Sequence, residues 1–315
     1  MPTEPKSKHI PRATIQRLAT YVQVLENFAR DGVEVISSNP LAEACGVNGS
    51  QVRKDLAYFG EFGIRGVGYH ITSLIAAITS SLGVDREWRM ALVGVAPELP
   101  GAKVFAARLK DFNILPCTGH SDADCNCALK AFGWGFRHVT HLYSCMSSVH
   151  RTNGYRHGGI VEAAFLNDFM TVELIADGAH LPPELLKLVY KIKGPEKIAL
   201  ITDSMRGAGM PEGKSVLGCI TDGLPVIVED GVAKLPDRTA FAGSVATCDR
   251  LVKTMVQLAE IPLSKAVQMA SQTPADILSL AGKGQIKEGF DADIVIFDKD
   301  IHIMKTIVGG KVVYG

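Results

Sequence analysis

The sequence lacks an excess of charge of either sign and any long hydrophobic run. It contains 33 basic and 33 acidic residues, so no net charge draws the whole chain toward nucleic acid or a membrane surface. No hydrophobic run approaches the roughly 20 residues that a membrane-spanning helix needs. The N-terminus reads MPTEPKSKHIPRATI and lacks the apolar core of a signal peptide. These absences predict a cytoplasmic protein that does not act at a membrane.

The cysteines and glycines exclude two further kinds of site. The seven cysteines are scattered and odd in number, which fits reduced thiols better than a disulfide framework. Cys125 and Cys127 have no second pair, so they do not match a zinc knuckle. The apolar run at residues 91–95 is followed by Ala-Pro-Glu-Leu-Pro, where a dinucleotide-binding fold has a glycine-rich turn. Proline offers no amide to a pyrophosphate, so we expect no NAD cofactor and no effect of NAD(H).

Short helices are predicted before this run. Apolar side chains recur at helical spacing in residues 14–28, which predicts an amphipathic helix. Residues 37–40 read SSNP and offer a cap and a first-turn proline. The short helix that follows is predicted over residues 41–45 and ends at Gly46.

A second short helix is predicted immediately afterwards. Asn48 and Gln51 suit a capping box at its start. Its apolar stripe consists of Val52, Leu56 and Phe59. Gln51, Arg53 and Lys54 lie on the other side, and alternating glycines in residues 60–69 predict a hairpin wing that carries Arg65. Two helices joined by a tight glycine turn are typical of a helix-turn-helix domain.

The basic residues of this region allow two interpretations. Residues 1–94 hold ten Lys or Arg and nine Asp or Glu, so total charge does not distinguish DNA binding from a solvated polar face. Their placement favours DNA, because they fall on the N-terminal arm, the second helix and the wing, where phosphates would lie. These residues are Arg12, Arg17, Arg53, Lys54 and Arg65.

Residues 9–95 strongly resemble the winged-helix domain of the redox-sensing repressor Rex. The shared strings are IPRATIQRLATY, SSNPLAEACGVNGSQVRKDLAYFGEFGIRGVGY and LGVDREWRMALVG. The resemblance implies that Gln51, Arg53 and Lys54 enter the major groove of duplex DNA, and that Arg65 flanks it. Ala19 replaces the usual proline. The dinucleotide domain beyond its first strand and the C-terminal dimerisation helix of that family have no counterpart, so NAD sensing is not expected.

Strands and helices alternate in the remaining two thirds, which predicts βα units around a parallel sheet. The predicted strands are residues 91–95, 114–118, 136–141, 171–176 and 197–202. The last four end at His120, His141, His180 and Asp203. In a (β/α)₈ barrel such strand ends face the active site, which favours a metal or acid–base site over structural histidines. The other histidines are assigned to the surface or loops: His9, His70, His138, His150, His157 and His302.

These residue types fit metal-dependent hydrolysis. Two imidazoles can hold a divalent metal, which lowers the pKa of bound water and polarises a carbonyl. Asp203 could take the proton of that water and return it to a leaving amine. His180 could donate to the substrate, and Arg151 would suit a phosphate or carboxylate.

Residues 95–315 resemble N-acetylglucosamine-6-phosphate deacetylase, of the amidohydrolase superfamily. The shared motifs are APELPGA, CTGHSDA, THLYSCM, IADGAHLPP, LITDSM, FAGSVAT and GQIKEGFDADIVIFD. The resemblance implies His120 and His141 as ligands of a divalent metal, with zinc expected, and Asp203 as the catalytic acid–base. It also implies that His180 and Arg151 contact an amino-sugar phosphate, with the arginine reaching a neighbouring subunit of a homo-oligomer.

The sequence departs from the deacetylase pattern in three places. Backbone at Ser144 and Cys145 is implied to hold the sugar phosphate, although the family more often has Asn-Ala there. The family's first sandwich strands, its His-x-His strand and its metal-binding glutamate have no counterpart, and Glu98 is the one carboxylate available as a substitute. Residues 305–314 supply C-terminal sandwich strands, and five of eight barrel strands are counted. We therefore expect little or no hydrolysis by the isolated chain.

The fold class that follows is α/β in three parts. We expect a winged helix over residues 1–90, an incomplete (β/α)₈ barrel over residues 91–290 and β-sandwich strands over residues 291–315. The main hypothesis is a deacetylase-type metallohydrolase joined to a DNA-binding domain. Two alternatives stay open: a DNA-binding regulator whose hydrolase-like part only binds a sugar phosphate, and a joining of two gene fragments without a shared function.

Overall fold

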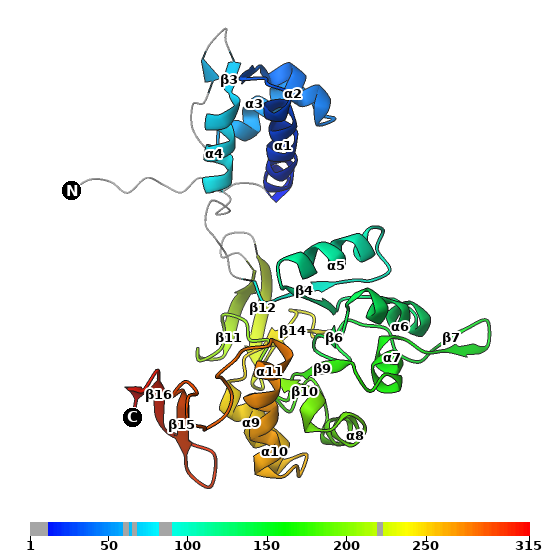
Figure 1. The fold of residues 1–315 in the computed structure, drawn as a ribbon, viewed down its shortest axis with the longest axis vertical. Helices are drawn as coiled ribbons and strands as arrows, with labels where there is room; N and C mark the ends of the chain where they lie inside the picture. The colour runs from blue at the N-terminus through cyan, green and yellow to red at the C-terminus, as the bar shows by residue number, and fades with distance from the viewer. Residues whose placement is uncertain (1–11, 59–62, 65–67, 82–89, 219–222) are drawn as a thin grey trace. The chain divides into compact units, whose positions relative to one another are not determined.

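The computed structural model describes residues 12–58, 63–64, 68–81, 90–218 and 223–315 (Figure 1). The chain divides into two compact units, Met1–Arg89 and Met90–Gly315. The further division predicted at residue 290 stays a prediction. Among the described residues, no helix is long and apolar enough to span a membrane.

The larger unit is built on five parallel strands. They are β4 (Leu92–Val95), β5 (Leu115–Thr118), β6 (His138–Val139), β9 (Thr171–Leu174) and β10 (Ile198–Leu200). The strands lie side by side in sequence order, and every neighbouring pair is parallel. The predicted βα rhythm is therefore confirmed. The strands are shorter than predicted: β4, β5, β6 and β10 begin later, and β6, β9 and β10 end earlier.

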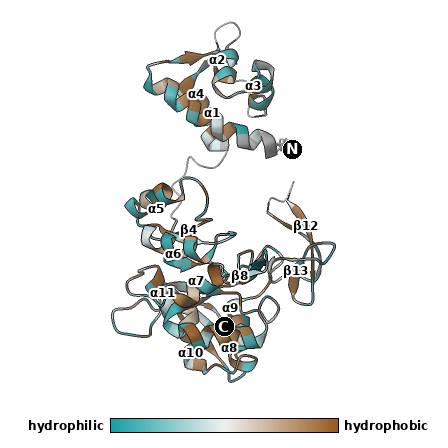
Figure 2. Ribbon diagram, turned by 90° about the vertical axis from the view of Figure 1, so that its right-hand side faces the viewer, coloured by the Kyte–Doolittle hydropathy of each residue, from teal (hydrophilic) through white to brown (hydrophobic). Residues whose placement is uncertain are grey.

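Helices connect these strands and cover one face of the sheet (Figure 1). They are α5 (Ala102–Asp111), α6 (Cys125–Trp134), α7 (Ile160–Leu166) and α8 (Pro183–Lys193). Both hydrophobic and hydrophilic residues occur along them (Figure 2). Val172 and Leu174 of β9 belong to the same core as Leu186 and Val189 of α8. Since side chains alternate along a strand, Glu173 faces the opposite side of the sheet.

One histidine of this sheet was assigned to the wrong environment from the sequence. His138, assigned to the surface or a loop, begins β6 and is 2% exposed. The assignment was wrong because a strand of two residues leaves almost no periodic signal. His150 and His157 do lie exposed, on the hairpin of β7 (His150–Thr152) and β8 (Tyr155–His157).

A single bridge links β14 to the segment that follows β10. Ser204 forms a parallel bridge with Ser244, the last residue of β14 (Phe241–Ser244). Ser244 N donates to Asp203 O at 3.0 Å, and Met205 N donates to Ser244 O at 2.9 Å. The parallel sheet itself has the five strands that were predicted. β14 also ends an antiparallel sheet with β11 (Gly213–Leu217), β12 (Leu224–Glu229) and β13 (Val232–Lys234).

The rest of this unit is helical and then antiparallel. The short helix η1 (Pro195–Lys197) precedes β10, and three helices follow β14: α9 (Cys248–Gln257), α10 (Leu263–Ala270) and α11 (Gln272–Ile277). A three-stranded sheet comes last, with β15 (Ile294–Phe297), β16 (Ile303–Val308) and β17 (Lys311–Tyr314). The strands predicted over residues 305–314 are part of this sheet.

The described part of the smaller unit contains four helices. They are α1 (Arg12–Arg30), α2 (Ser38–Ala44), α3 (Gly49–Leu56) and α4 (Ile71–Ser81). The helix predicted over residues 14–28 is confirmed and extends two residues further at each end. Its core residues Leu18, Tyr21 and Leu25 are fully buried. The sequence analysis missed α4, although its apolar residues recur at helical spacing.

The α2–α3 turn follows the predicted caps only in part. Ser37 is the N-cap of α2, so this helix begins three residues earlier than predicted. Asn48 Oδ1 accepts a hydrogen bond from Gln51 N at 2.8 Å, as expected of an N-cap. The Gln51 side chain instead donates to Asp55 Oδ1 at 2.9 Å, so the second half of the capping box does not form.

Three short strands complete this unit. β1 (Val35–Ile36), β2 (Gly63–Ile64) and β3 (Gly68–His70) form an antiparallel sheet in the order β1-β3-β2. β2 and β3 pair as the predicted hairpin requires, while Phe59 and Arg65 lie outside the described residues. Gly68 has φ +117°, and a Cβ there would lie 2.6 Å from Ile36 O, so only glycine fits.

A buried carboxylate joins α1 to α3. Asp55 is fully buried and accepts two hydrogen bonds from Arg17, at 2.7 and 2.8 Å, and one from Tyr21 at 2.8 Å. Thr14 and Gln51 supply two more. Burial alone would raise the pKa of Asp55, but these hydrogen bonds lower it to about 2. Arg17, expected to face DNA phosphates, is therefore paired inside the protein.

We predict that Asp55→Asn will loosen the packing of α1 on α3 by about 3 kcal/mol, because Arg17 would lose a buried partner. The stability that ionised Asp55 gives the wild type should be fully present above pH 4 and should fall as pH drops toward 2. The folded-state pKa lies below the ordinary value of 3.8, so protonation favours the unfolded state, by up to about 2 kcal/mol. Hydrogen exchange of α1 and α3 peptides, measured against pH, tests this. Asp31→Asn, at an exposed carboxylate of the same unit, should change nothing.

Candidate functional site

Two predicted metal ligands are in direct contact. His120 follows β5 and His141 follows β6, and their Nε2 atoms lie 3.0 Å apart with the rings edge to face. Both residues have positive φ, 47° and 25°, so the backbone turns sharply where each strand ends. Non-glycine residues rarely adopt this conformation, and it is concentrated at functional sites. Parallel pairing of β5 with β6 therefore brings the two imidazoles together.

The histidine pair fits a shared cation. Two ligand nitrogens of one tetrahedral zinc, each at about 2.05 Å, lie roughly 3.3 Å apart, close to the observed separation. Without a cation, only one of the two Nε2 atoms can carry the proton between them. His141 Nδ1 is buried and has no hydrogen-bond partner among the described residues, whereas metal-binding histidines usually donate from the second nitrogen. The pair therefore supplies two ligands, one of them weakly oriented.

A third ligand does not join the pair within the described residues. The group of three or more ligating side chains found there consists of Asp298, Asp300 and His302, on the β15–β16 loop. Asp203 follows β10, is exposed and has φ 46°, but it belongs to no such group with His120 and His141. The structure thus places Asp203 at a strand end with its side chain exposed.

Glu98 does not occupy a ligand position. Its two carboxylate oxygens accept from Ser121 Oγ at 2.6 Å and from Asp122 N at 3.0 Å. The carboxylate therefore fixes the loop that follows His120.

Sequence reasoning missed Glu173, which lies beneath His141. Its Oε2 accepts from Thr140 Oγ1 at 2.5 Å and from His141 N at 3.3 Å, and its Oε1 lies 3.0 Å from His138 Nε2. Burial would raise the pKa of Glu173, but the hydrogen bond with His138 and these other contacts lower it. An ionised glutamate thus holds the end of β6. The signal in the sequence was a single acidic residue within an apolar strand.

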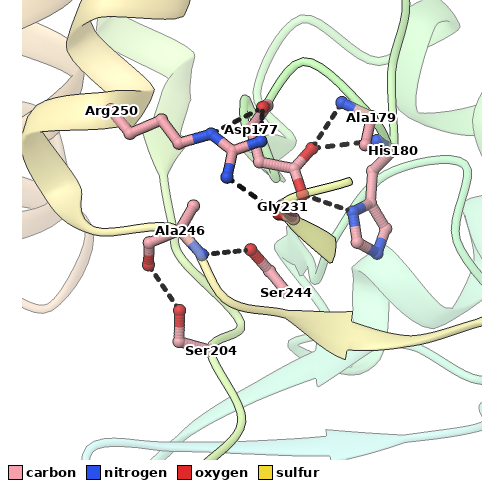
Figure 3. Close-up of polar contacts among 8 residues, drawn as sticks. All are labelled: Asp177, Ala179, His180, Ser204, Gly231, Ser244, Ala246 and Arg250. Atoms are coloured by element: carbon pink, nitrogen blue, oxygen red, sulfur yellow. Dashed lines mark hydrogen bonds and ion pairs between the residues drawn. The ribbon is translucent and has the colours of Figure 1, made fainter. Parts of the chain in front are cut away.

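His180 is oriented by a second missed residue, Asp177 (Figure 3). Asp177 Oδ2 lies 2.8 Å from His180 Nδ1, and Oδ1 accepts from Ala179 N and His180 N at 2.9 Å each. Burial would raise the pKa of Asp177, but the hydrogen bond with the His180 side chain and the backbone amides lower it. Because Asp177 is ionised, it accepts a hydrogen bond from Nδ1 of His180, and Nε2 takes no part in this contact.

The predicted phosphate contacts lie on two other segments. Arg151 is exposed on β7, opposite Arg156 of β8. Ser144 N donates to His141 O at 2.9 Å, and Cys145 O accepts from Ser121 N at 3.1 Å. The Ser144–Cys145 backbone therefore links the two loops that carry His120 and His141.

The predicted DNA-contacting residues lie mostly on α3. Arg53 and Lys54 are exposed, and Arg53 Nη1 donates to Ser38 Oγ at 2.7 Å across the α2–α3 turn. Gln51 is half-buried and bonded to Asp55. Arg65 lies outside the described residues.

Comparison with known families agrees with both halves of this description. Residues 95–313, more than half of the chain, match the family described as Amidohydrolase family. The chain belongs to the amidohydrolase family. Residues 9–57 match the family described as Putative DNA-binding protein N-terminus.

The relatives of the amidohydrolase unit are deacetylases. The N-acetylglucosamine-6-phosphate deacetylase of Lysinibacillus sphaericus is 36% identical over 220 residues, 70% of this chain and 54% of that protein. A solved N-acetylglucosamine-6-phosphate deacetylase from Thermotoga maritima has a TM-score of 0.66 and 26% identity, covering 96% of this chain and 84% of that one. The redox-sensing repressor Rex of Solidesulfovibrio magneticus is 67% identical over 90 residues, 29% of this chain and 41% of that protein. The chain thus spans about half the length of the curated relatives it matches.

We predict weak zinc binding that depends on the histidine pair. His120→Ala and His141→Ala should each abolish it, because one remaining imidazole cannot hold the ion. Affinity should fall well below that of a catalytic zinc site, which usually has three protein ligands. Calorimetric titration of the full chain with zinc measures this. His150→Ala, on the exposed β7 strand, is the matched control, and a loss of binding there would contradict the assignment.

Proposed function

We propose that the amidohydrolase unit is of the deacetylase type: it binds a divalent metal, with zinc expected, and the N-acetyl group of an amino-sugar phosphate, while the lack of a third metal ligand among the described residues limits its catalysis. The observation that carries this proposal is the contact between His120 Nε2 and His141 Nε2 at the ends of adjacent parallel strands. The in-order sheet of five parallel strands supports an incomplete (β/α)₈ barrel. Sequence identity to the deacetylases supports the substrate class.

The chain's own residues divide the chemistry as follows. A metal held by the Nε2 atoms of His120 and His141 would polarise the amide carbonyl and acidify water. Asp203 accepts the proton of the attacking water and returns it to the departing amine. His180 contacts the substrate through Nε2, because Asp177 occupies its Nδ1, and donation from Nε2 requires a ring that carries a proton on both nitrogens.

The sugar phosphate is assigned to two further groups of the chain. The Ser144–Cys145 backbone, which links the loops of His120 and His141, holds it from within the same subunit. Arg151, exposed on its hairpin, would serve the site of a neighbouring subunit in a homo-oligomer. An arginine can bind a phosphate through two parallel hydrogen bonds.

We also propose that the first unit is a winged helix that binds duplex DNA. The α2–α3 turn, the exposed Arg53 and Lys54 and the β2–β3 hairpin support this, together with 67% identity to a Rex repressor. Gln51 and Arg65 remain in the proposed contact surface, the former anchored by Asp55. DNA and a phosphorylated sugar as partners both favour the cytoplasm.

We predict little or no release of amine from N-acetylglucosamine-6-phosphate by the purified chain with added zinc. The described residues supply only two converging metal ligands, and small displacements of catalytic groups can cost about 10²-fold. Turnover of roughly 1–10³ s⁻¹, abolished by His120→Ala or Asp203→Ala, would contradict this and would establish a complete enzyme. Saturable binding of the sugar phosphate without turnover would favour the alternative of a regulator.

We predict weak, salt-sensitive binding of the full chain to Rex-type palindromic DNA. Arg53→Ala and Lys54→Ala should each weaken it, and loss of one phosphate contact should reduce the salt slope by about one. If the proposed oligomer does not pair two of these modules, the avidity of a linked dimer is lost, commonly a factor of about 10². Fluorescence anisotropy measures the affinity. Arg30→Ala, at the exposed end of α1, is the control, and unchanged affinity in both α3 variants would refute the assignment.

A further inference from the structure

Arg250, near the start of α9, has a guanidinium directed at main-chain oxygens (Figure 3). Nε and Nη2 donate to Asp177 O at 3.0 and 2.7 Å, and Nη1 donates to Gly231 O at 2.8 Å. An arginine fork usually pairs with a carboxylate or phosphate. Here it joins three segments: α9, the β12–β13 turn and the loop after β9.

The residue that Arg250 holds is the one that orients His180. The Asp177 carboxylate is fully buried and bonded to the His180 ring and to two backbone amides of the same loop. Its main-chain oxygen is bonded twice by Arg250. Hydrogen bonds therefore hold both the carboxylate and the main-chain oxygen of Asp177. A shift of its backbone would move the carboxylate that bonds to His180 Nδ1.

The space for this guanidinium depends on Gly231. This residue has φ +70°, and a Cβ built on it would lie 3.0 Å from Arg250 Nη1 and 3.3 Å from Nη2. A side chain at residue 231 would therefore strain the backbone and require the guanidinium to shift by a few tenths of an ångström, while leaving the arginine in the sequence. This gives a second and independent way to disturb the contact.

The same junction anchors the loop of Asp203. Ser204 Oγ donates to Ala246 O at 2.5 Å, and Ala246 N donates to Ser244 Oγ at 2.9 Å (Figure 3). The segment between β14 and Arg250 thus contacts both loops that carry predicted site residues. His180 is also packed on Phe241 of β14, with ring centroids 4.8 Å apart.

We propose that Arg250 is a positioning residue for His180. It holds the Asp177 backbone so that the carboxylate fixes His180 Nδ1 and leaves Nε2 for the substrate, a role that rests on the proposed function. The competing explanation is that Arg250 only ties α9 to the β12–β13 turn. The two explanations differ in whether loss of the Arg250 contact frees the His180 ring from Asp177.

The test is histidine-selective ¹H–¹⁵N NMR of the full chain. Arg250→Met keeps the apolar stem and removes the donors, and Arg250→Lys keeps one charged donor. Arg238→Met, which removes an exposed arginine paired with Glu229 near β13, is the matched control. The measured quantity is the exchange rate of the His180 Nδ1 proton with water. Melting temperature is recorded for each variant.

In Arg250→Met we expect the exchange of the His180 Nδ1 proton to accelerate at least about tenfold. Arg250→Lys should give a rate between those of Arg250→Met and the wild type, and Arg238→Met should leave the rate unchanged. A lowered melting temperature with unchanged Nδ1 exchange would overturn the proposal in favour of a purely structural role. If Arg250→Met does not fold, Gly231→Ala decides by the same measurement.

The readout needs neither metal nor turnover. A wild-type chain that binds no zinc and releases no amine would therefore end the proposed function without affecting this test. Conversely, unchanged exchange would end the positioning role even if the chain proved to be an active deacetylase.

Discussion

Parallel pairing of the strands in sequence order is the constraint on which the larger unit depends. Each strand is entered from the same side, so the residues that follow β5, β6, β9 and β10 all emerge at one edge of the sheet. His120 and His141 come from adjacent strands and reach contact at 3.0 Å although 21 residues separate them. The site is thus a consequence of topology, with sharp turns at each strand end directing the side chains.

Strand rhythm and strand-end residues could be predicted from the sequence, because both are local. His120, His141 and Asp203 each follow an apolar run. The residues that orient them could not be predicted, because their contacts cross between strands. Glu173 looks like a misplaced charge in an apolar strand until β6 is laid beside β9, where His138, Thr140 and the His141 amide meet its carboxylate. The contact of β14 with Ser204 could not be predicted either, because it is a single bridge between distant segments.

Three buried carboxylates perform a similar task in different places. Asp55 holds α1 against α3, Glu173 holds the end of β6, and Asp177 holds the His180 loop. In each case burial opposes ionisation and hydrogen bonds restore it, so the carboxylate stays charged and its donors stay in place. A buried carboxylate is stable only with its full set of hydrogen-bond donors. Each of these residues therefore fixes the segments that carry its donors.

In the amidohydrolase unit, the carboxylates that orient the site are fully hydrogen-bonded, whereas the set of metal ligands is incomplete. Glu173 and Asp177 have all the partners their charge requires, while His120 and His141 form only a pair and His141 Nδ1 has no partner among the described residues. Binding a ligand needs oriented groups, whereas hydrolysis also needs a metal held tightly enough to acidify water. A site that lacks one metal ligand is therefore impaired in hydrolysis far more than in ligand binding. Of the two proposed properties, binding of an amino-sugar phosphate therefore depends less on a third metal ligand than hydrolysis does.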